Sequence, residues 1–291
     1  MGNVTEVITF KKRPMEGPPI KKLSKEQYLD LRSGEVKDYE HIENRAECKD
    51  SITRTLAWIR ALINTNVTEP QNCRWVTLTY AENMTDTARL YKDYHAFWKR
   101  FCYWCKTNGH SKPEYISVIE PQGRGAWHVH AFFIWGEKAP FVPNNEVTQA
   151  LWGHGFTKTK EVTDCDNVGA YFSAYLADMP LDEAMQLPEV ERRKATQGRE
   201  VMDKQFTNEA NQTKEKKFVK GGRLYLYPAG MNIVRRSRGI KSPEVSWTTS
   251  GEAREKASSG KLTFSSAFEV LNDDGQPVNV LLKEYYNSKR R

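Results

Sequence analysis

Two strand-like segments separated by a very short loop constrain the fold of this chain more than any other feature. The segments are EYISVIE (residues 114–120) and WHVHAFFIW (residues 127–135), and PQGRGA joins them. Strands this close in sequence pair as an antiparallel hairpin, because a parallel pair needs a crossover of a dozen residues or more. The sequence therefore predicts an antiparallel sheet with this hairpin in it.

The segments around the hairpin predict an α+β fold. RWVTLTY (residues 74–80) alternates apolar and polar positions and predicts another strand, and residues 155–162 predict a further one. Between them, apolar side chains from Leu90 to Cys105 recur at helical spacing, which predicts a helix with one face in the core. Further helices are expected within residues 40–63 and from Asn167 onward. Strands that follow one another closely, with helices between them, favour antiparallel pairing.

The flanking regions divide the chain into three parts. Residues 1–40 predict a largely unstructured N-terminal tail, residues 41–241 the main domain, and residues 242–291 a C-terminal extension of unknown role. The extension holds a possible hairpin, FSSAFEV and VNVLLKEYY, around the turn NDDGQP. Within the main domain, residues 181–215 predict helix and loop, and RLYLYP (223–228) predicts a short strand followed by a basic turn.

Composition places the chain among cytoplasmic proteins. No apolar run approaches the ~20 residues of a membrane span, and the N-terminal sequence lacks the pattern of a signal peptide. The five cysteines are irregularly spaced, and the lone Cys102-x-x-Cys105 pair falls within a predicted helix, which favours packed thiols over a disulfide framework.

Positive charge is concentrated in one segment. The chain carries a net charge of +7, and residues 214–241 hold nine basic residues and one acid (Glu215), a sum of +8 that leaves the rest of the chain at −1. Such concentration favours a polyanion-binding segment over a merely solvated face.

The hairpin carries a candidate metal site. Residues i and i+2 of a strand point to the same face, so His128 and His130 project together, ~7 Å apart along the strand. If residue 120 pairs with residue 128, Glu120 lies beside His128 on that face. Two neutral imidazoles and a carboxylate form a three-ligand site with open positions. The same residue types fit a two-histidine, one-carboxylate iron site, but their spacing argues against it.

Two tyrosines are candidate nucleophiles. Tyr171 and Tyr175, in NVGAYFSAY, are four residues apart and share a face if the segment is helical. A phenol can attack as a covalent nucleophile when a base or metal assists it, and packing at the margin of the core is the alternative. With a metal site before them and a basic segment after them, the tyrosines point to phosphodiester chemistry. No P-loop motif occurs in the chain.

These motifs, in this order, resemble those of the HUH (His-hydrophobic-His) endonucleases of the rolling-circle replication initiator class, including plasmid, mobile-element and phage types. TLTYAENMTD (77–86) resembles the first family motif, Glu120 with WHVHAFF the metal motif, and YFSAY the catalytic motif in its two-tyrosine form. RLYLYPAGMNIVRRSRGIKSP resembles a segment found after the tyrosine helix in related replication proteins. The resemblance covers about residues 45–241 and implies a central antiparallel sheet of about five strands flanked by helices.

The resemblance also implies an activity and its partners. Glu120, His128 and His130 would hold Mg²⁺ or Mn²⁺, and Tyr171 would nick single-stranded DNA at a replication origin, forming a 5′-phosphotyrosine link and a free 3′-OH. Tyr175 would carry out a second transfer that rejoins the strand. Family members of this type rely on a host helicase and polymerase.

One departure from the family pattern keeps alternatives open. Many relatives carry a lysine three residues after the tyrosine, where this chain has Ala174 and Asp178. A non-catalytic DNA-binding protein on the same scaffold, or a transposase or relaxase of the same superfamily, therefore stay alternative hypotheses.

Overall fold

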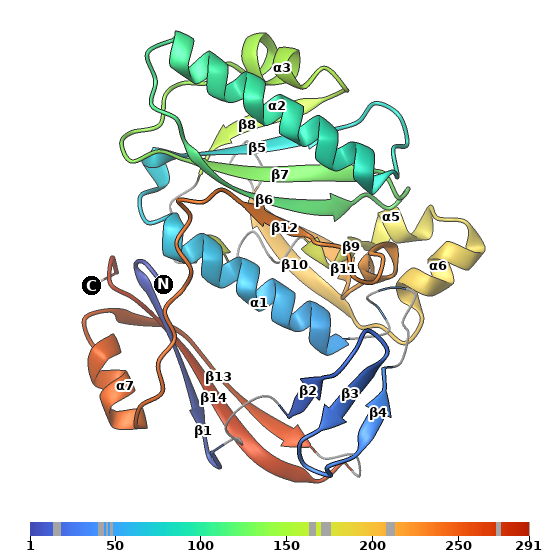
Figure 1. Ribbon diagram of the computed structural model, residues 1–291, viewed down its shortest axis with the longest axis vertical. Helices are drawn as coiled ribbons and strands as arrows, with labels where there is room; N and C mark the ends of the chain where they lie inside the picture. The colour runs from blue at the N-terminus through green and yellow to red at the C-terminus, as the bar shows by residue number, and fades with distance from the viewer. Residues whose placement is uncertain are drawn as a thin grey trace. The chain divides into compact units, whose positions relative to one another are not determined.

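The chain forms two compact units in the computed structural model, which describes residues 1–13, 19–39, 44, 46, 49–162, 167–169, 176–207, 213–271 and 275–290. The first unit comprises Met1–Gly2 and Asn44–Glu244, and the second comprises Asn3–Glu43 and Val245–Arg291. Figure 1 labels their helices and strands.

A five-stranded antiparallel sheet forms the centre of the first unit, as predicted. Its strand order is β12-β6-β7-β5-β8, and every neighbouring pair is antiparallel. The strands are β5 (Cys73–Thr79), β6 (Glu114–Pro121), β7 (Trp127–Ile134), β8 (Thr157–Glu161) and β12 (Val234–Arg236). The predicted hairpin is β6 and β7, at the middle of the sheet.

Helices cover both faces of this sheet (Figure 1). Helix α2 (Thr87–Thr107) lies on one face, where the Phe101 and Phe133 rings stack with centroids 4.6 Å apart. Helix α1 (Lys49–Asn66) lies on the other face and contributes Ile59, Leu62 and Ile63 to the same core. Both helices bury a stripe of apolar side chains at helical spacing, which accounts for their position.

A glycine closes the turn of the β6–β7 hairpin. Gln122 and Ala126 pair across the loop, since the Gln122 N–H donates to the Ala126 carbonyl at 2.8 Å. Gly125 within it has φ +87°, a left-handed conformation that costs a residue with a Cβ. The local sequence therefore sets the register of the two strands.

Shorter elements complete the first unit. They are η2 (Pro70–Asn72), η3 (Asn144–Gln149), α3 (Ala150–Trp152), β9 (Met179–Pro180), α5 (Leu181–Met185), α6 (Glu189–Thr196), β10 (Val201–Thr207), β11 (Thr213–Val219) and η4 (Leu224–Leu226). Strands β10, β11 and β9 form a small antiparallel sheet. The expectation of helix and loop over residues 181–215 missed the β10–β11 hairpin, because its mostly polar sequence carries no clear alternation.

The prediction of a strand at RLYLYP is wrong. The segment contains the 3-10 helix η4, and the strand β12 lies in the following basic stretch instead. Leu224 packs in the main core, whereas Tyr225 and Leu226 pack on a second small cluster around Met179 and Val219. A segment held between two cores shows apolar residues on both sides, which gives it the appearance of a strand.

The second unit joins the two ends of the chain. Strands β1 (Val4–Phe10), β14 (Pro277–Asn287) and β13 (Lys261–Leu271) form a sheet in that order, and β13 and β14 are the predicted C-terminal hairpin. Strands β2 (Ile20–Lys22), β3 (Gln27–Asp30) and β4 (Val36–Asp38) form another sheet, and α7 (Ser250–Ala257) is the helix of this unit. The prediction of a largely unstructured tail over residues 1–40 is therefore wrong for the described residues.

Candidate functional site

The hairpin aligns the three predicted ligands in the predicted register. Glu120 pairs directly with His128, and Val118 pairs with His130. On the other side of β7, Thr77 of β5 pairs with His130. Because side chains alternate along a strand, all of these groups lie on the sheet face opposite α2, while Val129 and Phe133 point into the α2 core.

His130 is held by a hydrogen bond at each ring nitrogen. Its Nε2 lies 2.6 Å from Glu120 Oε2, and its Nδ1 lies 3.2 Å from the Thr77 hydroxyl. With the proton on Nε2, the ring donates to Glu120 and accepts from Thr77. With the proton on Nδ1, the ring donates to Thr77, and Nε2 offers its lone pair to a cation. Thr77 can serve either tautomer because a hydroxyl both donates and accepts.

His128 has a buried nitrogen without a hydrogen-bond partner. Its Nε2 is shielded from solvent and contacts no donor or acceptor among the described residues, and its ring centroid lies 6.1 Å from that of His130. Burial lowers the pKa of His128 to about 3 and that of His130 to about 4, with the His130 and Lys160 charges as secondary causes respectively. Both imidazoles are therefore neutral near pH 7, the form in which histidine binds a metal.

Glu120 also pairs with a cation that the sequence did not point to individually. Its other carboxylate oxygen forms an ion pair with Arg223, which precedes η4. The Arg223 Nη2 also donates to Glu183 Oε2 at 2.8 Å. Glu183 in turn accepts the Gly123 backbone N–H at 2.6 Å. A Cβ at residue 123 would lie 2.5 Å from Glu183 Oε1, so a larger residue there would displace the Glu183 carboxylate from this position.

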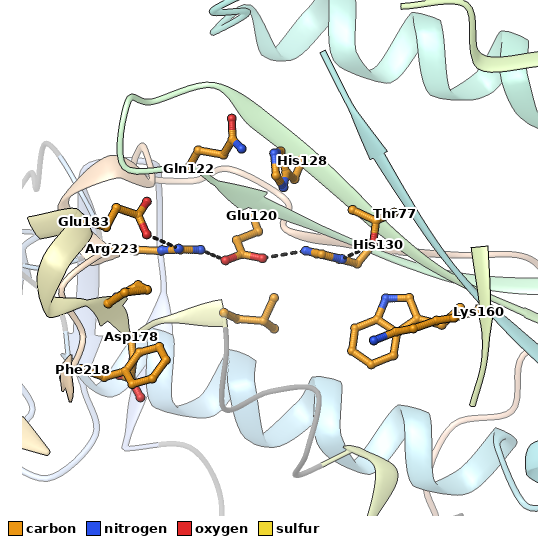
Figure 2. Close-up of a pocket in the computed structure, with 13 residues that line it drawn as sticks. Thr77, Glu120, Gln122, His128, His130, Lys160, Asp178, Glu183, Phe218 and Arg223 are labelled. Carbon is orange, nitrogen blue, oxygen red and sulfur yellow. Dashed lines mark hydrogen bonds and ion pairs between the residues drawn. The ribbon is translucent and has the colours of Figure 1, made fainter. Parts of the chain in front are cut away.

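These groups line a cavity of about 590 Å³ on the α1 side of the sheet. Figure 2 shows His130, Glu120, Arg223 and Glu183 following one another along its wall. Lys160 of β8 lines the cavity as well, with its Nζ 4.1 Å from the centre of a Trp75 ring. The remaining side chains of the lining are Thr77, Gln122, His128, Leu176, Asp178, Pro180 and Phe218.

The donor set fits a divalent cation in its chemistry. Two neutral imidazoles and a carboxylate meet on one face, and the buried Nε2 of His128 lacks the hydrogen bond that such a group normally makes. The ligands are not arranged around a common point, and the described ranges contain no group of three or more His, Cys, Asp or Glu side chains so arranged. To bind a cation, the Glu120 carboxylate would have to give up its contacts with His130 and Arg223 and contact the metal instead.

Tyr171 and Tyr175 lie outside the described residues. On their C-terminal side, Leu176 and Asp178 line the cavity, and Asp178 accepts the Gly221 backbone N–H at 2.7 Å. On their N-terminal side, Gly169 donates its N–H to Asn64 of α1 at 2.9 Å.

Several residues of the cavity were not singled out from the sequence. Arg223 lies in the basic segment, but nothing in its neighbours marks it as the partner of Glu120. Lys160 lies in residues 155–162, whose strand pattern is weak, and Thr77 looks like an ordinary strand residue. For Thr77, the signal was available: it belongs to the first family motif and occupies the polar face of its strand, as His130 does.

Comparison with known families gives a match over the region that holds most of this site. Residues 73–180 match the family model described as Replication-associated protein ORF2/G2P. No curated protein and no solved structure matched the chain. In the part of the chain that the structure describes, no helix has the length and apolar character needed to cross a membrane. The family match confirms the predicted resemblance to replication proteins over residues 73–180, which are similar to the replication-associated protein ORF2/G2P family.

Proposed function

We propose that the chain is a rolling-circle replication initiator that nicks and rejoins single-stranded DNA. The observation that carries this proposal is the cavity, in which two neutral histidines and a carboxylate meet two cations, Arg223 and Lys160. The family match, which spans Glu120, His128, His130 and Lys160 but not Arg223, supports a replication-associated role. The motif order adds a tyrosine nucleophile, which is the element that a strand-transfer reaction needs.

In the proposed reaction, a tyrosine hydroxyl oxygen attacks a backbone phosphorus. The new bond joins the Tyr171 oxygen to phosphorus, and the bond from phosphorus to the 3′ oxygen breaks. The tyrosine loses its proton, the departing 3′ oxygen gains one, and the 5′ phosphate stays on the protein. Attack by a free 3′-OH on this link rejoins the strand and restores the phenol, and Tyr175 would perform the second transfer.

The side chains of the cavity have separate parts in this reaction. Glu120, His128 and His130 would hold Mg²⁺ or Mn²⁺, which when bound withdraws charge from the nonbridging oxygens of the phosphate. Arg223 and Lys160 would hold the phosphate through charge-assisted hydrogen bonds and oppose the negative charge that develops on it. They would thus replace the lysine that many relatives carry beside the tyrosine. A host polymerase would extend the free 3′-OH, and a host helicase would unwind the duplex ahead of it.

A covalent adduct tests the proposal. We expect the purified protein, incubated with Mn²⁺ and labelled single strands of random sequence, to form a protein–DNA band that survives denaturing electrophoresis. Peptide mapping should find the nucleotide on Tyr171, or on Tyr175 in Tyr171→Phe. Tyr103→Phe is the matched control, because Tyr103 is 70% exposed on α2, outside the cavity.

A second function is favoured by one observation. Glu120 is engaged by both Arg223 and His130, which is the arrangement expected of a site that binds DNA without a metal. This non-catalytic DNA-binding protein would bind single strands with equal affinity in the presence of Mn²⁺ or a chelator and would yield no adduct. Adduct formation that depends on Mn²⁺ and is lost in His128→Ala excludes it.

A further inference from the structure

The basic segment of residues 214–241 is divided by the fold into two parts. In the first part three of the five cations are matched within the protein: Lys216 pairs with Asp182 at 3.0 Å and Lys220 with Glu200 at 3.2 Å. Arg223 pairs with Glu120 and Glu183 inside the cavity. These cations therefore contribute little positive field outside the protein.

The second part places its cations in solvent at the edge of the central sheet. Arg235 and Arg236 belong to β12, the edge strand, and Arg238 and Lys241 follow it; all four are exposed. No carboxylate of the described residues forms an ion pair with any of the four. Glu114 is nearby, and its carboxylate accepts the Gly239 backbone N–H at 3.1 Å.

Each arginine of the edge strand lies over an aromatic ring. The Arg235 guanidinium carbon is 3.6 Å from the centre of the Tyr91 ring of α2. The Arg236 guanidinium carbon is 5.7 Å from a Trp58 ring centre on α1, on the other face of the sheet. Successive residues of a strand point to opposite faces, so Arg235 and Arg236 place positive charge on both faces of the sheet at this edge.

A second cavity adjoins the Trp58 side of this edge. It has a volume of about 500 Å³, with Trp58, Leu62, Met231 and Ile233 as apolar walls and Arg54 and Arg236 as cations. Trp58 is 40% exposed, although it is a large aromatic side chain. Among the described residues, this cavity shares no lining residue with the first one and has no acidic side chain in its lining.

Hydrogen bonds hold the loop after β12 in place. The Arg236 Nη1 donates to Ser242 Oγ at 2.9 Å. The Lys241 backbone N–H donates to Asn66 Oδ1 at 2.9 Å, and Asn66 Nδ2 donates to the Lys241 carbonyl at 2.8 Å. The backbone that carries these cations is therefore held in place before a ligand binds, which reduces the conformational entropy lost on binding.

We propose that this sheet edge is a second binding surface for single-stranded DNA, separate from the cleavage cavity. Phosphates would lie along Arg235, Arg236, Arg238 and Lys241, and an unpaired base would enter the second cavity and stack on Trp58. Cations beside an accessible aromatic ring are the combination that holds single strands without reading their sequence. The ligand rests on the proposed function, since it is the strand that the first cavity would cleave.

Removal of the edge charges tests the phosphate contacts. The edge variant carries Arg235→Gln, Arg236→Gln and Arg238→Gln, and binding of a labelled single strand is followed by fluorescence anisotropy over a salt series. We expect affinity at ~0.1 M salt to fall about 10- to 100-fold and the slope of log K against log salt to fall by ~2, because each phosphate contact on a single strand contributes ~0.7 to that slope. All three side chains are exposed, so we expect only a small loss of thermal stability, from the Arg236–Ser242 hydrogen bond and the two ring contacts.

A matched control separates local from general charge effects. Arg193→Gln, Lys194→Gln and Lys220→Gln together remove the same charge from exposed positions elsewhere, and we expect less than about a twofold change in affinity. Equal loss in the control and edge variants, or wild-type affinity and slope in the edge variant, overturns the proposal.

Trp58 tests the identity of the ligand. Trp58→Ala should weaken single-strand binding about 5- to 150-fold, the range for loss of one stacked base, whereas Trp58→Phe should keep most of the affinity. Both variants should bind the matching duplex with the affinity of the wild type. If Trp58→Ala lowers the affinity for duplex and for single strand equally, the base-stacking assignment is overturned.

The failure of this proposal can be told apart from failure of the proposed function. The edge variant should need a higher DNA concentration than the wild type to form the same amount of tyrosine adduct. If no protein forms an adduct, the anisotropy measurements still decide the edge surface.

Discussion

Replacement of Arg223 by methionine should reveal competition between this arginine and a divalent cation for Glu120. The Arg223 and Glu120 side chains are 13% and 7% exposed, so the change leaves a buried carboxylate without its cation. Breaking a buried ion pair from one side costs about 3–5 kcal/mol. For a domain of this size, ~1 kcal/mol shifts the melting temperature by about 2–4 °C. We expect Arg223→Met, without metal, to melt roughly 6–20 °C below the wild type.

Mn²⁺ should then restore much of the stability that the variant lost. A cation at the site would take the place of the guanidinium beside Glu120, and a ligand at ~100 times its dissociation constant stabilises by about 2.7 kcal/mol. The shift of the melting temperature on adding Mn²⁺ should therefore be larger in Arg223→Met than in the wild type, as measured by scanning calorimetry. Arg193→Met, at an exposed ion pair with Glu189, is the control and should change stability by less than ~0.5 kcal/mol.

An Mn²⁺ shift in Arg223→Met that is equal to or smaller than the wild-type shift would show that the two cations do not compete, and the reasoning from the Glu120 contacts would be refuted.

Two further predictions concern the histidines. Burial lowers the pKa of His128 to about 3 and that of His130 to about 4, so between these values and pH ~6.5 the unfolded chain binds more protons than the folded protein does. The free energy of unfolding should therefore have its full value above pH ~6.5 and should decrease as the pH is lowered. The slope in urea denaturation should reach at most about 1.4 kcal/mol per pH unit for each histidine and should drop in His128→Gln; an unchanged slope would contradict the assignment. Thr77→Val removes the hydrogen bond to His130 Nδ1 and should lower Mn²⁺ affinity about 10- to 100-fold in calorimetric titration, and wild-type affinity would show that Thr77 does not orient the ring.

The sequence predicted the central hairpin well because its determinants are local. Alternation in β5, β6 and β7 identified the strands, and the loop length and Gly125 determined which residues face one another. The pairing of Glu120 with His128 followed from that register. Helix α2 could be predicted equally well from the sequence, since its apolar stripe has helical spacing over its whole length.

The parts that could not be predicted depend on contacts between distant residues. Arg223 contacts Glu120 only because the chain returns to the hairpin about 100 residues later. In the sequence, Arg223 looks like the other cations of the basic segment, so nothing singles it out as the residue that pairs with Glu120. The strands of residues 1–40 were missed for a related reason: β1 pairs with β14 at the far end of the chain, and short polar strands show little pattern of their own. The roles of the histidines, Glu120, Tyr171 and Tyr175 in catalysis stay predictions.

The pairing of β1 with β14 has a consequence for the order in which the protein forms during synthesis. Val4 lies opposite Asn287, so β1 leaves the ribosome long before its partner strand exists. The five-stranded sheet, by contrast, needs nothing beyond β12 at Val234–Arg236. Domains generally fold as units while the chain grows, and contacts between distant residues form late because the intervening chain must first be closed into a loop. The unit that contains the five-stranded sheet can therefore assemble co-translationally, while β1 stays unpaired until β14 emerges.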